Sequence, residues 1–261
     1  MDLGIKGKTA LVLASSRGLG QAMAHSLARE GVQVAVTGRN AEGLAQTVKM
    51  IESVGGKALA LNWDLADLNA IDGHVQTIEN QLGPVDILIN NTGGPPPTPA
   101  SGQDPQLWQK SFQEMVLSLM KITDRVLPGM RERRWGRIIT STTSGAIVPI
   151  RNLAISNTLR AALLGWSKTL AAEVAADGVT VNVIMPGRVA TDRLRQLDEA
   201  RAKRENITYD AVVSASLKTI PAGRYGDPKE YGDTAAFLAS QNASYITGSV
   251  IRVDGGQVPS I

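Results

Sequence analysis

The stretch from Lys8 to Gly20 reads KTALVLASSRGLG and predicts a strand, a tight turn and the start of a helix. Its apolar residues are followed by small ones, and Gly18 and Gly20 open a helical pattern. In such a unit the backbone N–H groups and the positive end of the helix dipole point at one spot, where an anion such as phosphate binds. Alanine stands at position 14, where turns of this type usually carry their first glycine. The turn alone is weak evidence for a phosphate-binding site, and the rest of the chain is needed to support that interpretation.

The composition of the 261-residue chain is that of an ordinary globular protein, with 43% hydrophobic and 20% charged residues. No cysteine is present, which excludes disulfides and thiolate metal sites or nucleophiles. The two histidines, His25 and His74, lie far apart within helical patterns. A Ser-His-Asp triad or a histidine-rich metal site is therefore not expected.

The charge and hydropathy patterns argue against a membrane or a nucleic acid as a binding partner. No apolar run approaches the ~20 residues of a membrane span, and the first residues, MDLGIKGK, lack the apolar core of a signal peptide. We therefore expect a cytoplasmic protein without a membrane partner. The net charge is only +3 and the basic residues are dispersed, so nucleic acid is not an expected partner.

Short apolar or β-branched runs alternate with longer amphipathic ones along the chain. The predicted strands are 10–13, 33–37, 58–62, 87–90, 137–140, 180–184 and 250–253. The predicted helices are 19–30, 41–54, 67–82, 105–134, 152–176, 192–217 and 228–239. The strands are continuous apolar runs rather than alternating ones, which is typical of a parallel sheet buried on both faces. We therefore predict one α/β domain over 1–261, a doubly wound parallel sheet with helices on both faces.

Ligands of a doubly wound sheet bind outside the carboxyl ends of its strands. The residues that follow the predicted strands are mostly small or polar. They include Ser15 to Arg17, Gly38 and Arg39, Asp64, 90–93, 141–144 and 186–191. This distribution predicts a nucleotide-binding cleft at one edge of the sheet.

The same residues belong to motifs that resemble those of classical short-chain dehydrogenases/reductases, in that family's order and over nearly the whole chain. The motifs are the glycine turn, WDLAD at 63–67, NNTG at 90–93, GRIITSTTSG at 136–145, PGRVAT at 186–191 and YITGSVIRVDGG at 245–256. The resemblance implies a Rossmann-like fold with seven parallel strands and a small substrate lid near 192–217. It also implies a homodimer or homotetramer that assembles through the long helices near 105–134 and 152–176.

The residue that closes the second strand indicates which cofactor is bound. An acidic side chain there binds the ribose 2′-OH, whereas a positive one accommodates a 2′-phosphate. Arg39 holds this position and Arg17 lies in the glycine turn, so NADP(H) is expected. NAD(H) is the alternative, in which both arginines are solvated surface residues.

The resemblance also implies which residues bind the cofactor. They are Ser15, Ser16, Arg17, Gly18, Leu19, Gly20, Arg39, Asp64, Leu65, Asn91, Thr92, Gly93, Arg160, Pro186, Gly187, Val189 and Thr191. For Asp64 a turn or helix-cap role is the alternative. We expect Ala14 to need only a φ angle that a Cβ tolerates.

The family's active site uses an asparagine, a serine, and a tyrosine and lysine spaced i, i+4 on one helix. The flanking motifs place these positions on Met115, Thr143, Ser156 and Arg160. The first tyrosine of the chain is Tyr209, and no lysine occurs between 121 and 168. No shifted alignment therefore restores the tyrosine and lysine pair.

The candidate catalytic residues are Thr143, Ser156 and Arg160. A serine hydroxyl is far less acidic than a phenol with a pKa of about 10, so Ser156 can donate a hydrogen bond but is a poor proton donor. Arg160 keeps a positive charge one helical turn away, and Thr143 keeps a hydroxyl. For Ser156 the alternative is a tolerated polar residue on an interface helix.

Two functional hypotheses follow. The first is an NADP(H)-dependent oxidoreductase with a non-standard active site, similar to the 3-oxoacyl-thioester reductases, acting on a small-molecule carbonyl or alcohol. The second is a dinucleotide-binding sensor or structural subunit without dehydrogenase activity. The basic stretches 131–134 and 193–204 have the charge to attract an acyl-carrier or coenzyme-A thioester, but their interleaved acids favour a solvated helix face.

Overall fold

The computed structural model describes residues 2–260. Within them, seven parallel strands form one sheet in the order β3-β2-β1-β4-β5-β6-β7. The strands are β1 (Thr9–Val12), β2 (Gln33–Gly38), β3 (Ala58–Asn62), β4 (Ile87–Asn90), β5 (Gly136–Ser141), β6 (Val179–Pro186) and β7 (Val250–Val253). The chain winds outward from β1 to β3, then returns to place β4 beside β1. The order reverses between β1 and β4, which is where doubly wound sheets bind nucleotides.

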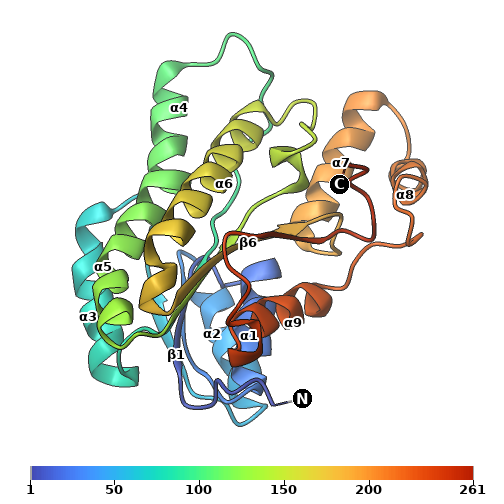
Figure 1. The fold of residues 1–261 in the computed structure, drawn as a ribbon. Helices are drawn as coiled ribbons and strands as arrows, with labels where there is room; N and C mark the ends of the chain where they lie inside the picture. Colours follow the sequence, from blue (N-terminus) through green and yellow to red (C-terminus); the bar gives the residue numbers. More distant parts are fainter. Residues whose placement is uncertain (1, 261) are drawn as a thin grey trace.

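Helices cover both faces of this sheet (Figure 1). One face carries α1 (Gly18–Arg29), α2 (Ala41–Glu52) and α9 (Pro228–Leu238), and the other carries α3 (Ile71–Leu82), α5 (Ser118–Glu132) and α6 (Ala154–Val174). The sheet separates two hydrophobic cores, and alternate residues of the first strand point into one or the other. Ala10 and Val12 join the hydrophobic core beneath α1 and α9, whereas Leu11 and Leu13 join the core beneath α5 and α6. The predicted doubly wound α/β fold is confirmed.

Two predicted helices are interrupted in the structure. The helix expected over 105–134 consists of α4 (Pro105–Phe112), a π-helical turn (Gln113–Leu117) and α5. The helix expected over 192–217 is divided into α7 (Asp192–Glu205) and α8 (Tyr209–Leu217).

The division between α7 and α8 has a local cause. Asn206 ends α7 in the left-handed region, with φ 52°, a conformation that asparagine adopts more readily than most residues. The hydroxyl of Thr208 then accepts a hydrogen bond of 3.2 Å from the Ala211 N–H and caps α8. The prediction of one continuous helix was wrong here, because apolar periodicity continues across a break that only the Asn and Thr caps reveal.

Neither a membrane span nor a metal centre is found in the described part of the chain. No helix of residues 2–260 is both long and apolar enough to cross a bilayer. The same residues contain no cluster of three or more His, Asp or Glu side chains placed to hold a metal ion.

Candidate functional site

The turn between β1 and α1 is a preformed anion cradle. Asn91, just after β4, holds it in place, because its side-chain N–H groups donate to Leu13 O and Ala14 O, each at 3.2 Å. Gly20 lies beneath the turn, and a Cβ there would stand 2.3 Å from Ala14 O. At the start of α1 the Arg17 side chain makes no capping hydrogen bond. The N–H groups of the first helical turn are therefore left for an anion.

Ala14 departs from the sequence expectation. Its φ is 47°, in the left-handed region, which costs a residue with a Cβ ~1–2 kcal/mol. The expectation of a φ that a Cβ tolerates was wrong, because the turn requires the backbone that glycine normally supplies. Asn91 and a 3.2 Å hydrogen bond from the Ala14 N–H to Thr37 Oγ1 hold the strained residue.

We expect Ala14→Gly to raise the free energy of unfolding by ~1 kcal/mol, since relief of the left-handed strain exceeds the added entropy of the unfolded chain. Urea denaturation measures this change. The matched control is Ala45→Gly at an exposed position inside α2, where the same replacement should lower stability by ~1 kcal/mol. Equal losses in both variants would contradict strain at Ala14.

The two serines of the turn differ in what they can offer a ligand. Ser15 is fully buried. Its N–H donates to Thr37 O at 2.8 Å, and its hydroxyl donates to Val12 O at 2.8 Å and accepts from the Thr37 N–H at 2.9 Å. Ser15 thus fastens the turn to β2. Ser16 is half-buried beside Gly38, and direct contact of either serine with a cofactor stays a prediction.

Arg17 and Arg39 are exposed at the carboxyl ends of β1 and β2. Arg39 Nη1 lies 3.8 Å from Asp64 Oδ2, and the two side chains are 72% and 48% exposed. Such a surface pair contributes ~0–1 kcal/mol, so the guanidinium is available to a phosphate. The other carboxylate oxygen of Asp64 accepts a hydrogen bond of 3.0 Å from the Ala66 N–H, which is the turn role named as its alternative. Leu65 packs against the core, and its contact with a cofactor stays a prediction, as does that of Asp64.

Arg160 is a buried guanidinium that joins the carboxyl ends of β4 and β5. Its Nη1 donates to Ser141 O at 3.1 Å, and its Nη2 donates to Thr92 O and Gly93 O, each at 3.1 Å. These partners are neutral carbonyl groups, and burial lowers the pKa of Arg160 to about 10. The structure therefore places a desolvated positive charge at the strand ends; the ribose-binding and catalytic roles of Arg160 stay predictions.

The other three positions of the predicted active site lie on α6 or at the two short turns that pack against it. Ser156 is half-buried on α6, one turn before Arg160. Thr143 precedes the short 3₁₀ turn that packs against α6, and its Oγ1 accepts from the Gly145 N–H at 3.3 Å. Met115 is 3% exposed in the core and lies within the π-helical turn. Such turns occur frequently at functional sites, and here one coincides with the family's asparagine position.

The segment after β6 lies opposite the phosphate turn. A Cβ on Gly187 would stand 2.6 Å from the Asp254 Cα, so this segment passes tightly against the end of β7. Thr191 caps α7, with its Oγ1 accepting from the Leu194 N–H at 3.3 Å. A Cβ on Gly18 would lie 3.8 Å from Thr191 Cγ2, so α7 starts directly across from the turn. Pro186, the last residue of β6, and Val189, in the segment that follows, are buried.

A buried ion pair holds α7 over the site. Asp198 is 1% exposed, and it accepts hydrogen bonds from Arg188 Nη1 at 2.7 Å and from the Tyr225 hydroxyl at 2.8 Å. Burial, together with the bond to Asp198, raises the pKa of Tyr225. The expected lid therefore has a defined position, set by the Arg188 guanidinium from the loop before it and the Tyr225 hydroxyl from the loop after it.

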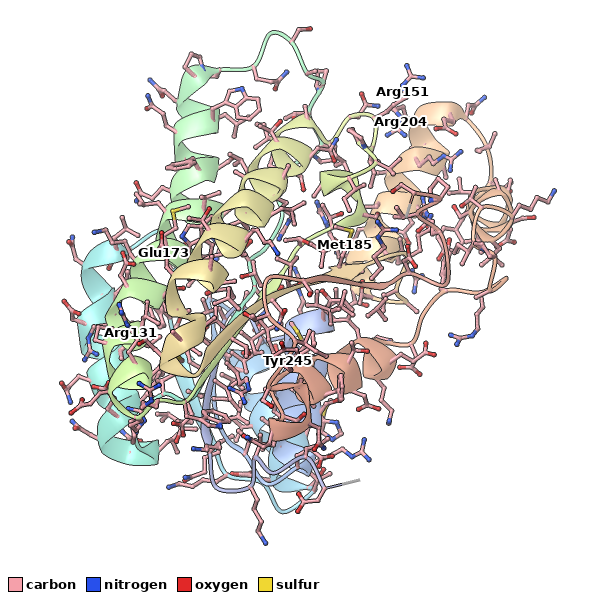
Figure 2. All side chains as sticks on the ribbon, viewed as in Figure 1. Arg131, Arg151, Glu173, Met185, Arg204 and Tyr245 are labelled. Atoms are coloured by element: carbon pink, nitrogen blue, oxygen red, sulfur yellow. The ribbon has the colours of Figure 1, made fainter. Side chains whose placement is uncertain are left out.

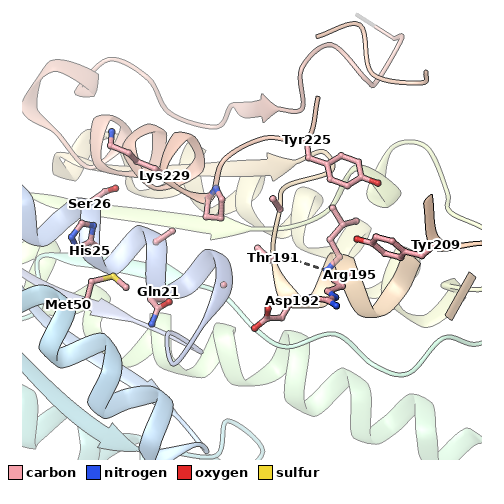
Figure 3. A pocket seen from close by; sticks show the side chains of 15 residues that line it. Gln21, His25, Ser26, Met50, Thr191, Asp192, Arg195, Tyr209, Tyr225 and Lys229 are labelled. Carbon is pink, nitrogen blue, oxygen red and sulfur yellow. Dashed lines mark hydrogen bonds between the residues drawn. The ribbon is translucent and has the colours of Figure 1, made fainter. Parts of the chain in front are cut away.

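A cavity of about 550 Å³ opens between α1 and α7 (Figure 3). Gln21 and His25 line one side, and Arg195 and Tyr209 line the other. Of the predicted cofactor residues only Gly18 and Thr191 line it. The cavity therefore adjoins the phosphate turn and is distinct from the predicted catalytic centre.

Tyr231 is a residue of the site's support that the sequence analysis did not name. It is fully buried on α9, and its hydroxyl shares a 2.9 Å hydrogen bond with Ser141 Oγ and donates to Ile184 O at 3.0 Å. Burial raises the pKa of Tyr231. From α9, Tyr231 thus connects the carboxyl-terminal parts of β5 and β6. The only sequence feature that could have indicated this role is a tyrosine on the apolar face of a predicted helix.

Comparisons with known proteins agree with this geometry. Residues 13–257 match a family described as enoyl-(acyl carrier protein) reductase. The chain is 35% identical over 257 residues to the 3-oxoacyl-(acyl-carrier-protein) reductase of Vibrio harveyi, covering 97% of this chain and 98% of that relative. The chain belongs to the short-chain dehydrogenase/reductase family.

Solved structures of two reductases share the whole fold. L-sorbose reductase from Gluconobacter frateurii, complexed with NADPH and L-sorbose, matches with a TM-score of 0.94 at 30% identity over 100% of both chains. A variant of the actinorhodin polyketide ketoreductase with NADPH matches with a TM-score of 0.92 at 28% identity, over 97% of this chain and 98% of that one. These proteins are oxidoreductases, and this chain is similar to them along its full length.

Proposed function

We propose that this protein is an NADP(H)-dependent oxidoreductase that acts on a small-molecule carbonyl or alcohol. The proposal is supported mainly by the preformed anion cradle between β1 and α1. Asn91 holds this turn in place by hydrogen bonds, and Thr191 lies across from it. The similar L-sorbose reductase and actinorhodin ketoreductase structures both contain NADPH. The similarity to a 3-oxoacyl-(acyl-carrier-protein) reductase makes 3-oxoacyl thioesters the first substrate class to test.

The residues present fit this cofactor. The uncapped first turn of α1 offers N–H groups to the pyrophosphate, and the space above Gly20 admits no side chain. The exposed guanidiniums of Arg17 and Arg39 can bind the 2′-phosphate bidentately. When bound, the cofactor supplies the hydride that the reaction needs.

The proposed active site is non-standard, since it lacks the phenol that serves the family as proton donor. The hydroxyls of Thr143 and Ser156 would orient the carbonyl oxygen by hydrogen bonding. The desolvated charge of Arg160 would stabilise the negative charge that develops on that oxygen. Because serine is a weak acid, the proton would come from water, and turnover would be slow for the family.

A titration and a turnover assay test this proposal together. NADPH fluorescence should report saturable binding, and its absence at millimolar cofactor would overturn both the oxidoreductase and the sensor hypotheses. NADPH oxidation is then followed over ketones, diones and acyl thioesters, with Arg160→Ala as the comparison. Turnover that depends on Arg160 supports the oxidoreductase, whereas binding without any turnover favours the sensor or structural subunit.

Cofactor choice gives a separate prediction. We expect Arg39→Gln to weaken NADPH binding about 10- to 100-fold, because a charge-assisted bond to the 2′-phosphate is lost. NADH binding should not change, since NADH has no such phosphate. Fluorescence titration with both cofactors measures the ratio of the two affinities. Equal losses for both would contradict the role given to Arg39.

We also propose that the chain assembles as a homodimer or homotetramer, with α5 and α6 in the interface. The outward positions of α6 are small at Ala162 and Gly165, which allows two helices to approach closely. Light scattering after size-exclusion chromatography distinguishes these states from a monomer. The cytoplasmic location stays a prediction.

A further inference from the structure

Arg193 differs from the other arginines of the segment that covers the site. The others all pair with a carboxylate: Arg188 with Asp198, Arg195 with Glu199, and Arg201 and Arg204 with Glu205. Arg204 lies near the C-terminal end of α7 (Figure 2). Arg193 lies in the first turn of the same helix. Within residues 2–260, Arg193 has no carboxylate partner, and its Nη2 donates to the carbonyl oxygen of Pro95 at 3.1 Å.

The position of Arg193 is electrostatically unfavourable. It lies in the first turn of α7, where the helix dipole disfavours a cation. Arg193 is exposed, but partial burial of its guanidinium and the nearby charge of Arg17 lower its pKa. Arg193 in turn contributes to the lowered pKa of Arg160. Arg193 is therefore repelled by the guanidiniums of both Arg17 and Arg160. No acidic side chain of the described chain pairs with any of them.

The contacts of Arg193 and Arg160 are close together. Arg160 donates to Gly93 O and Arg193 donates to Pro95 O, two residues further along the same loop. A Cβ on Gly94, between them, would stand 3.5 Å from Arg193 Nη2. This loop lies beside the predicted active site, because Arg160 joins it to the end of β5. Arg193 is exposed overall, and a guanidinium without a carboxylate partner keeps N–H groups free for an anionic ligand.

We infer that Arg193 binds an anionic group of the substrate, and that this group is a carboxylate. The inference rests on the proposed oxidoreductase function and names oxo acids or hydroxy acids as the substrate class, in place of the 3-oxoacyl thioesters, whose thioester group carries no carboxylate. The carboxylate would take the guanidinium N–H groups of Arg193 that the Pro95 carbonyl does not use. The phosphates of the cofactor are the other source of an anion in this space, and they already have the start of α1, Arg17 and Arg39.

The experiment uses matched pairs of ketones that differ in the charge of one carboxyl group and in the methyl group that masks it: 2-oxobutyrate, acetoacetate and levulinate, each beside its methyl ester. Binding to the NADP⁺-loaded protein is measured by ligand-observed NMR, which needs no turnover, and NADPH oxidation is measured in parallel. Wild type should prefer at least one acid over its ester by about 10- to 100-fold. Arg193→Gln should abolish this preference. Arg201→Gln, which removes an ion-paired arginine from the same helix, should retain it.

Each other outcome has a distinct meaning. Esters that bind as well as acids in wild type, or no acid that binds at all, would overturn the inference. An unchanged acid preference in Arg193→Gln, with weaker NADPH binding, would assign Arg193 to the cofactor phosphates instead. Acids that bind through Arg193 without NADPH oxidation would leave the inference standing and remove the oxidoreductase proposal.

Discussion

Gly20→Ala is expected to weaken NADPH binding by ~100-fold, because the added methyl group must displace the phosphate turn. The Cβ would stand 2.3 Å from Ala14 O and 2.9 Å from both Asn91 Nδ2 and the Ser15 Cα. Two of these neighbours are backbone atoms, so the clash cannot be relieved by a rotamer change. The turn would move, and the bonds from Asn91 that hold it would lengthen. Fluorescence titration with NADPH measures the effect.

Gly73→Ala is the matched control for this variant. Gly73 is an exposed residue of α3, and nothing lies within 4 Å of the position that its Cβ would take. The same added methyl should therefore leave NADPH binding unchanged and raise stability by up to ~1 kcal/mol through helix propensity. If Gly20→Ala bound NADPH as wild type does, the cradle would not be where the pyrophosphate binds.

In the phosphate turn, the secondary structure could be predicted from the sequence but the backbone strain could not. The strand, the turn and the helix were predicted from short-range patterns, and the structure has β1 and α1 within a residue of the expected bounds. The strained φ of Ala14 was not predicted, because it depends on Asn91, which is distant in sequence. Local patterns report local conformation, whereas strain is sustained by contacts that only the fold creates.

The candidate site shows the same limit. Family motifs placed Ser156 and Arg160 on one helix, and the structure confirms that helix as α6. The buried state of Arg160 and its carbonyl partners were not readable, since they come from β4 and β5. Arg193 belongs to a stretch predicted as a solvated helix face. That reading suits Arg195, Arg201 and Arg204, which are ion-paired, but Arg193 reaches across to a loop almost a hundred residues earlier.

Ser156→Tyr is expected to raise kcat/KM for carbonyl reduction by ~10²-fold or more. General acid catalysis typically contributes ~10²–10⁴ in rate, and the variant returns a phenol to the position where the family carries one. Ser156 precedes Arg160 by one turn of α6, so the two side chains share a helix face. The positive charge of Arg160 would favour the phenolate and lower the phenol pKa below its usual value of about 10. NADPH oxidation over the ketone panel measures the gain.

Ser156→Phe separates the acid from the shape of the added ring. It adds the same ring without the hydroxyl, so it should show no gain if proton donation is the missing step. The pH profile is the second readout. Because the protonated phenol is the donor, the activity of Ser156→Tyr should fall as the pH rises through the lowered phenol pKa. The pH profile of Ser156→Phe should not show this alkaline decrease in activity. If both variants gained equally, the ring and not the proton would limit turnover, and the proposed role of position 156 in proton transfer would fail.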